Sequence, residues 1–148
     1  MSVAPAWIEQ VAPLIKKQYT GKLYYKGDLH EGQGDRISFK GYDVLGFVTR
    51  PTDPKATAKE LRKSFDADMD RARAWAKRDG VPEIVISEHG NSGNMENIQM
   101  ASAEEFGIIL EEGSKKLNGV FLTEPMDVVL KTPKGDQIVE QMKKWFLR

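Results

Sequence analysis

Tyr42-Asp-Val-Leu-Gly-Phe-Val-Thr49 is a nearly continuous apolar run of strand length. Runs of this kind are typical of parallel strands that are buried on both faces. Further along the chain, Pro82-Glu-Ile-Val-Ile-Ser-Glu88 has β-branched residues at its centre and predicts a second strand. Between the two, apolar residues recur every three or four positions from Leu61 to Ala76, which predicts a helix. The order strand, helix, strand indicates a parallel pair with a right-handed crossover.

The ends of the helix between these strands, and the start of the helix after the second strand, have sequence signals of their own. Asp53 followed by Pro54 predicts an N-cap with proline in the first turn, and Gly80 predicts the end of the same helix. Residues 89–101 form a predicted loop. Ser102-Ala-Glu-Glu105 has the spacing of a capping box and predicts the start of the next helix.

The same alternation extends toward both ends of the chain. The further predicted elements are a helix over residues 4–18 that is interrupted by Pro13, a strand over 21–27, a polar loop over 28–40, a strand over 119–124, a short strand or irregular segment over 126–133, and a last helix capped by Asp136. Strands that alternate with helices predict an α/β fold with one parallel sheet of four strands, in a single domain over residues 1–148. A doubly wound sheet is the alternative, although no glycine-rich phosphate loop joins a strand to its helix.

The composition narrows the function classes. The 148 residues include 22 Lys and Arg against 22 Asp and Glu, so no net charge directs the chain to nucleic acid or to an anionic membrane. The absence of cysteine excludes disulfides and thiolate metal sites. No apolar run approaches the ~20 residues of a membrane span, and residues 1–13 lack the pattern of a signal peptide. We expect a cytoplasmic protein or part of a longer secreted enzyme, without a cofactor.

The three tryptophans fall on apolar faces of predicted helices. Trp7, Trp75 and Trp145 each lie at helical spacing from other apolar residues. We therefore expect all three in the core rather than on a surface that stacks against sugars.

Polar side chains gather where the predicted strands end. Carboxyl ends of parallel strands meet at one edge of a sheet, which is where α/β folds carry their sites. Glu88 directly follows a buried strand, and Glu124 takes the same position on the next strand, ~4.8 Å away. Two carboxyl groups this close serve acid/base chemistry or bind a metal. The other candidates, all for substrate binding, are Lys26, Asp28, His30, Arg50, His89, Asn91 and Asp127.

Each candidate also has a plainer interpretation. In that interpretation, Glu88 caps its strand or pairs with a nearby Lys or Arg, and Glu124 simply begins the last loop. His30 and His89 make ordinary loop hydrogen bonds. The two histidines form no metal-ligand motif, so no metal site is predicted.

The succession of strand motifs resembles strands five to eight of the clan A glycoside hydrolases, which are retaining enzymes built on a (β/α)8 TIM barrel. The motifs that carry the resemblance are Gly21-Lys-Leu-Tyr-Tyr25, Tyr42-Asp-Val-Leu-Gly-Phe47, Pro82-Glu-Ile-Val-Ile-Ser-Glu-His-Gly90 and Gly119-Val-Phe-Leu-Thr-Glu124. The resemblance covers residues 21–146 and rests on the order and spacing of short motifs. It implies that the chain is the C-terminal half of a barrel.

The resemblance also implies roles for individual residues. The glutamate that ends strand seven in that clan is the catalytic nucleophile, and Glu88 matches it. A retaining enzyme needs a second carboxyl group ~5–5.5 Å away as acid/base. In the clan that group ends strand four, which has no counterpart here, so Glu124 or a residue of another chain takes the role. The chain departs from the clan in Thr49-Arg50-Pro51, which follows strand six. The tryptophan common near the end of strand eight is missing, and Phe121 is the nearest aromatic residue.

A half-barrel exposes sheet edges, which invite pairing with further strands. We therefore expect a homodimer or a complementary N-terminal half-barrel, with a carbohydrate as substrate. Two alternatives stay open. One is a non-catalytic carbohydrate-binding or scaffold half-barrel. The other is an unrelated, metal-assisted α/β enzyme that uses Asp28, His30, Glu88 and Glu124.

Overall fold

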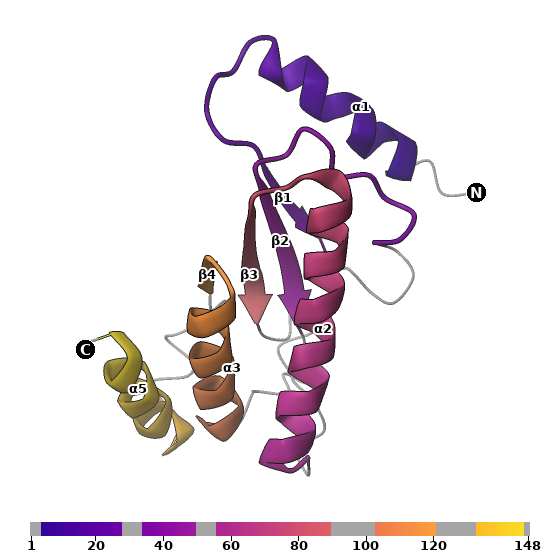
Figure 1. Ribbon diagram of the computed structural model, residues 1–148. Coiled ribbons are helices and arrows are strands. Elements are labelled where there is room, and N and C mark those ends of the chain that lie inside the picture. Colours follow the sequence, from indigo (N-terminus) through magenta and orange to yellow (C-terminus); the bar gives the residue numbers. More distant parts are fainter. Residues whose placement is uncertain (1–3, 28–33, 50–55, 90–102, 121–132, 147–148) are drawn as a thin grey trace.

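The computed structural model describes residues 4–27, 34–49, 56–89, 103–120 and 133–146 (Figure 1). The elements are α1 (Ala4–Lys16), β1 (Tyr24–Gly27), β2 (Val44–Thr49), α2 (Ala58–Asp79), β3 (Glu83–His89), α3 (Ala103–Lys116), β4 (Gly119–Val120) and α5 (Pro133–Phe146). The strands form one parallel sheet in the order β1-β2-β3-β4. The predicted α/β fold of four parallel strands alternating with helices, as in half of a TIM barrel, is confirmed.

One face of the sheet packs against α2 and α3, and we call it the helix face. Phe47 of β2 and Ile86 of β3 pack against Phe65 and Met69 of α2 and Ile109 of α3. Each of these side chains is at most 5% exposed. Burying an apolar side chain of this size contributes about 1.5–3 kcal/mol, so this cluster holds the two helices on the sheet.

A second apolar cluster closes the amino end of the helix face. Ile8 of α1, Phe39, Leu45 of β2 and Trp75 of α2 pack together there. Trp75 is 5% exposed and donates a hydrogen bond of 2.7 Å to Asp35, so its predicted core position is confirmed.

The prediction for the first tryptophan was wrong, because Trp7 is 63% exposed. The helix α1 continues through Pro13 and contacts the cluster with Ile8 on one side only. Of the described residues, the large apolar side chains that remain exposed are Trp7, Leu14, Ile15, Tyr19 and Tyr24. The side chain of Trp145 lies outside the described part of the structure.

The central helix α2 is capped by residues other than those predicted. Thr57 accepts a hydrogen bond from the Glu60 amide, and the Glu60 carboxylate accepts one from the Thr57 amide, which is a complete capping box. The predicted N-cap at Asp53 was therefore wrong, and Asp53 and Pro54 lie outside the described residues. At the other end, Gly80 ends the helix at φ 72°, a left-handed conformation that favours glycine, as predicted.

The last two helices begin close to their predicted positions. The helix α3 begins at Ala103, directly after the predicted cap Ser102, which lies outside the described residues. The helix α5 begins at Pro133, a favoured residue at the first helical position. Asp136 therefore lies inside the first turn, where it complements the helix dipole, and its prediction as the cap was wrong. Residues 121–132, which include the rest of the predicted fourth strand, lie outside the description.

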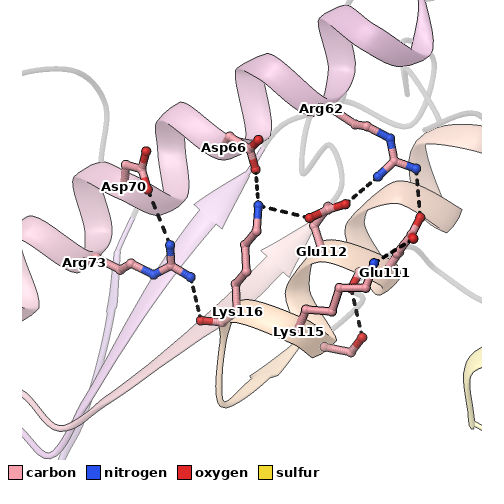
Figure 2. A network of polar contacts seen from close by, with 9 residues as sticks. Arg62, Asp66, Asp70, Arg73, Glu111, Glu112, Lys115 and Lys116 are labelled. Carbon is pink, nitrogen blue, oxygen red and sulfur yellow. Dashed lines mark hydrogen bonds and ion pairs between the residues drawn. The ribbon is translucent and has the colours of Figure 1, made fainter.

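Charged side chains bridge α2 and α3 (Figure 2). Arg62 of α2 pairs with Glu111 at 2.8 Å and with Glu112 of α3. Lys116 of α3 pairs with Asp66 of α2 at 2.6 Å and with Glu112 at 3.0 Å. The cations of Lys115 and Arg62 hold the pKa of Glu111 down at about 2. The network fixes how α3 lies along α2.

In the described ranges, none of the helices combines the length and the apolar character that crossing a bilayer requires.

Candidate active site

The face of the sheet opposite the helix face carries the alternating side chains of the strands, and we call it the inner face. Near its amino edge, Tyr24, Val44, Glu83 and Val85 line a hollow of about 320 Å³. Tyr24 lies over Gly46 of the neighbouring strand, where a Cβ would fall 2.4 Å from the tyrosine oxygen. A larger residue at position 46 would require the ring of Tyr24 to move.

At the carboxyl end of the inner face, Glu88 pairs with Lys26. The distance from Nζ to Oε2 is 2.8 Å, and the two side chains are 47% and 16% exposed for Lys26 and Glu88, respectively. Because β1 and β3 flank β2, this ion pair spans the middle strand. The hydrogen bond to Glu88 and its charge raise the pKa of Lys26. The two residues, both predicted for the site from strand ends, are thus brought together.

His89 follows Glu88 in the sequence but lies on the helix face. Its Nδ1 is 2.8 Å from Oγ1 of Thr49, and its Nε2 is 3.9 Å from Oε1 of Glu105 in α3. Burial of the ring, which is 1% exposed, lowers the pKa of His89 to about 4, so the imidazole is neutral near pH 7.

The ring of His89 lines a cavity of about 30 Å³ with residues of α2 and α3. A cavity of that volume holds a water molecule and no sugar ring. The structure therefore separates the two adjacent residues: Glu88 faces the inner side, and His89 faces the helices.

The remaining predicted site residues lie outside the described part of the chain. They are Asp28, His30, Arg50, Asn91, Glu124 and Asp127. The expected approach of Glu124 to Glu88 therefore stays a prediction. Within the described ranges, no three His, Asp or Glu side chains gather into a candidate metal site. Three of the four residues of the metal-assisted alternative are among the undescribed ones.

Two residues beside His89 were not among the predicted site residues. Thr49 is 5% exposed and Glu105 is 6% exposed, which is unusual for a hydroxyl and a carboxylate unless each has a polar environment. Thr49 ends the apolar run of β2, and Glu105 was predicted only as part of a helix cap. A polar residue that ends a buried strand opposite another strand end is the signal that points to such a pair.

Comparison with known proteins gives one solved structure to consider. No family of known proteins and no curated protein matches the chain. The structure is similar to that of a β-glucuronidase from an uncultured Clostridium species, with a TM-score of 0.54 and 14% identity over 82% of this chain. The match covers 23% of that enzyme, so this chain spans about a quarter of its length. At this identity the likeness concerns the fold alone.

Proposed function

We propose that this chain supplies strands five to eight of a (β/α)8 barrel that cleaves β-linked saccharides with retention, and that Glu88 is the nucleophile. The observation that carries the proposal is the position of the Glu88 carboxylate, which lies on the inner face at the carboxyl end of β3. In TIM barrels this end carries the catalytic residues. The fold shared with a β-glucuronidase supports the reaction class, and β-glucuronides belong among the substrates to test.

The chemistry takes two steps and requires two carboxyl groups. The Glu88 carboxylate attacks the anomeric carbon while an acid protonates the departing glycosidic oxygen, so that a glycosyl ester forms and an alcohol leaves. The same acid, now a carboxylate, then deprotonates a water molecule that attacks the anomeric carbon and releases Glu88. The ammonium group of Lys26 lies 2.8 Å from the carboxylate that would attack.

The acid is Glu124 or a residue of another chain or segment. We propose that the inner face is completed by a second copy of this chain or by a complementary half-barrel. A TIM barrel interior is filled by side chains from all of its strands. The hollow of about 320 Å³ beside Val44 and Val85 is the space that side chains of further strands would fill.

The edge of the sheet supports the same completion. The exposed apolar side chains of the described part, from Trp7 to Tyr24, all belong to α1, β1 and the turn between them. β1 is an edge strand of the sheet. Exposed apolar side chains beside an edge strand are typical of a contact with further protein.

One observation favours a second function, that of a non-catalytic carbohydrate-binding or scaffold half-barrel. The carboxylate of Glu88 is held by Lys26 at 2.8 Å, as in a structural ion pair. In this alternative the cation never releases the carboxylate to a sugar. Binding of saccharides without turnover would be the expected behaviour.

The two functions are separated by a trapping experiment that needs no acid. The purified chain is incubated with dinitrophenyl β-glycosides that carry fluorine in place of the hydroxyl next to the anomeric carbon. Dinitrophenolate departs without protonation, so a nucleophile is labelled even where the acid is missing. We expect mass spectrometry to find the fluoroglycosyl group on the peptide that contains Glu88.

The control comes from the same strand. Glu83→Gln changes a glutamate on the same face of β3 that pairs with Lys22, and it should label as the wild type does. Glu88→Gln should not label and should lower turnover of unfluorinated substrates at least about 1,000-fold. Light scattering on the same sample gives the mass, for which a dimer is twice 16.7 kDa. Sugar binding by a chain that never labels would sink the catalytic proposal.

A further inference from the structure

The register of β3 changes just before Glu88. Val44 pairs with Glu83 and Phe47 pairs with Ile86, but Val48 pairs with Glu88 rather than with Ser87. Ser87 is therefore an extra residue, a β-bulge in a parallel pair. Bulges concentrate near active sites, where they redirect a side chain.

The bulge decides which face Glu88 occupies. Side chains alternate between faces along a strand, so residues an odd number of positions apart lie on opposite faces. Glu83 and Glu88 are five positions apart, yet both lie on the inner face. In an unbulged strand, Ser87 would pair with Val48 and Glu88 would pair with Thr49 on the helix face.

Polar contacts next to the bulge stabilise the bulged register. The buried hydroxyl of Ser87 donates a hydrogen bond of 3.0 Å to the Phe47 carbonyl oxygen, which ties the extra residue to β2. One residue further, the Oγ1 of Thr49 lies 2.8 Å from Nδ1 of His89. The ring of His89 is neutral in this position, whereas the unbulged register would bury the charged Glu88 there at much higher cost.

We propose that Thr49, Ser87 and His89 form a register lock that turns Glu88 to the inner face. These three are positioning residues, because they act on Glu88 through the backbone of β3, and Thr49 and His89 lie on the helix face. Their meaning for catalysis rests on the proposed function. The lock itself does not, because the contact of Glu88 with Lys26 reports the face that Glu88 occupies.

The test follows the side-chain amine of Lys26 by NMR in the whole chain with ¹⁵N-labelled lysine. Contact with Glu88 raises the pKa of Lys26, and Glu88→Gln defines the value without that contact. Thr49→Val removes the bond to His89 at nearly constant shape, and Ser87→Ala removes the tie to β2. We expect both variants to move the pKa of Lys26 toward its value in Glu88→Gln, and we expect Thr49→Ser to restore the wild-type value. Glu83→Gln is the control that should leave it unchanged.

Activity gives an independent measurement. Misplacing a reacting group by about 1 Å costs on the order of 100-fold in rate, so Thr49→Val should lower kcat by about 10- to 100-fold with KM within about twofold. An unchanged Lys26 titration in folded Thr49→Val and Ser87→Ala chains would overturn the lock. A shifted titration in a chain that the fluoroglycosides never label would uphold the lock and reject the proposed reaction. Should one variant fail to fold, the other decides.

Discussion

The two ends of the inner face carry the same kind of ion pair in different settings. At the amino end Lys22 pairs with Glu83, and at the carboxyl end Lys26 pairs with Glu88. Glu83 is 33% exposed and Glu88 is 16% exposed. In both pairs a glutamate of β3 contacts a lysine that lies in β1 or just before it. The pairing alone therefore does not distinguish a structural carboxylate from a catalytic one.

What differs is the packing behind each glutamate. Behind Glu83 the helix face is apolar, with Phe39, Leu45 and Trp75 in one cluster. Behind Glu88 the helix face is polar, with the buried contact of Thr49 and His89. The amino end therefore stabilises the fold, and the carboxyl end uses buried polar groups to orient one side chain. This division is the one that TIM barrels show between their two ends.

The largest expected effect tests the structural role of the amino end. Phe39 is fully buried and lies 5.0 Å from the ring of Tyr25, so Phe39→Ala should lower the free energy of unfolding by about 3–5 kcal/mol. Urea unfolding followed by circular dichroism measures the change. Trp7→Ala is the matched control, because a side chain that is 63% exposed should change stability by less than about 0.5 kcal/mol. Equal losses in the two variants would contradict the assignment of the core to this end.

The next effect tests the polar carboxyl end by pH. The pKa of His89 is about 4 in the fold, against an ordinary value of 6.5, so the unfolded chain binds more protons between these values. Its contribution to stability is thus complete above about pH 6.5 and is lost as the pH falls toward 4, by about 3 kcal/mol at most. Urea unfolding at pH 7 and pH 4.5 measures this loss. His89→Phe should lack it, and an equal loss in that variant would show that other groups are responsible.

The smallest effect compares the two cations directly. Lys26→Met removes the charge beside Glu88 and should lower kcat about tenfold, a modest value because the lysine is half exposed. Lys22→Met removes the corresponding charge beside Glu83 and should leave kcat within about twofold. Turnover of dinitrophenyl glycosides measures both. A rise in kcat on loss of Lys26 would favour the view that the ion pair holds Glu88 inactive.

The sequence was sufficient for the order of the elements and for the parallel sheet. The apolar run 42–49 and the apolar helix positions from Leu61 to Ala76 are mostly residues that the fold buries. Burial therefore appears in the sequence as a regular spacing of apolar residues. The start of α2 was missed although its signal is local, because Thr57 and Glu60 have capping-box spacing. The exposure of Trp7 could not be predicted, since it depends on where α1 lies against the sheet.

The candidate site was predictable only in part. Lys26 and Glu88 follow from the rule that strand ends gather at one edge, and the structure pairs them. Which of the neighbours Glu88 and His89 faces the inner side could not be predicted, because a bulge leaves no mark in an alternating pattern. Strict alternation from Ile86 would place Glu88 on the helix face. The shift depends on contacts with β2, and these exist only once the two strands have paired.

The order of the strands in the sheet has a consequence for how the chain folds as it is made. Each strand lies beside the next one along the chain, from β1 to β4, so no pairing waits for a segment synthesised much later. Because domains assemble from the N-terminus during synthesis, we expect β1, β2 and α2 to come together while α3 and α5 are still inside the ribosome. The register of β3, and with it the direction of Glu88, would then be set on a template that is already folded.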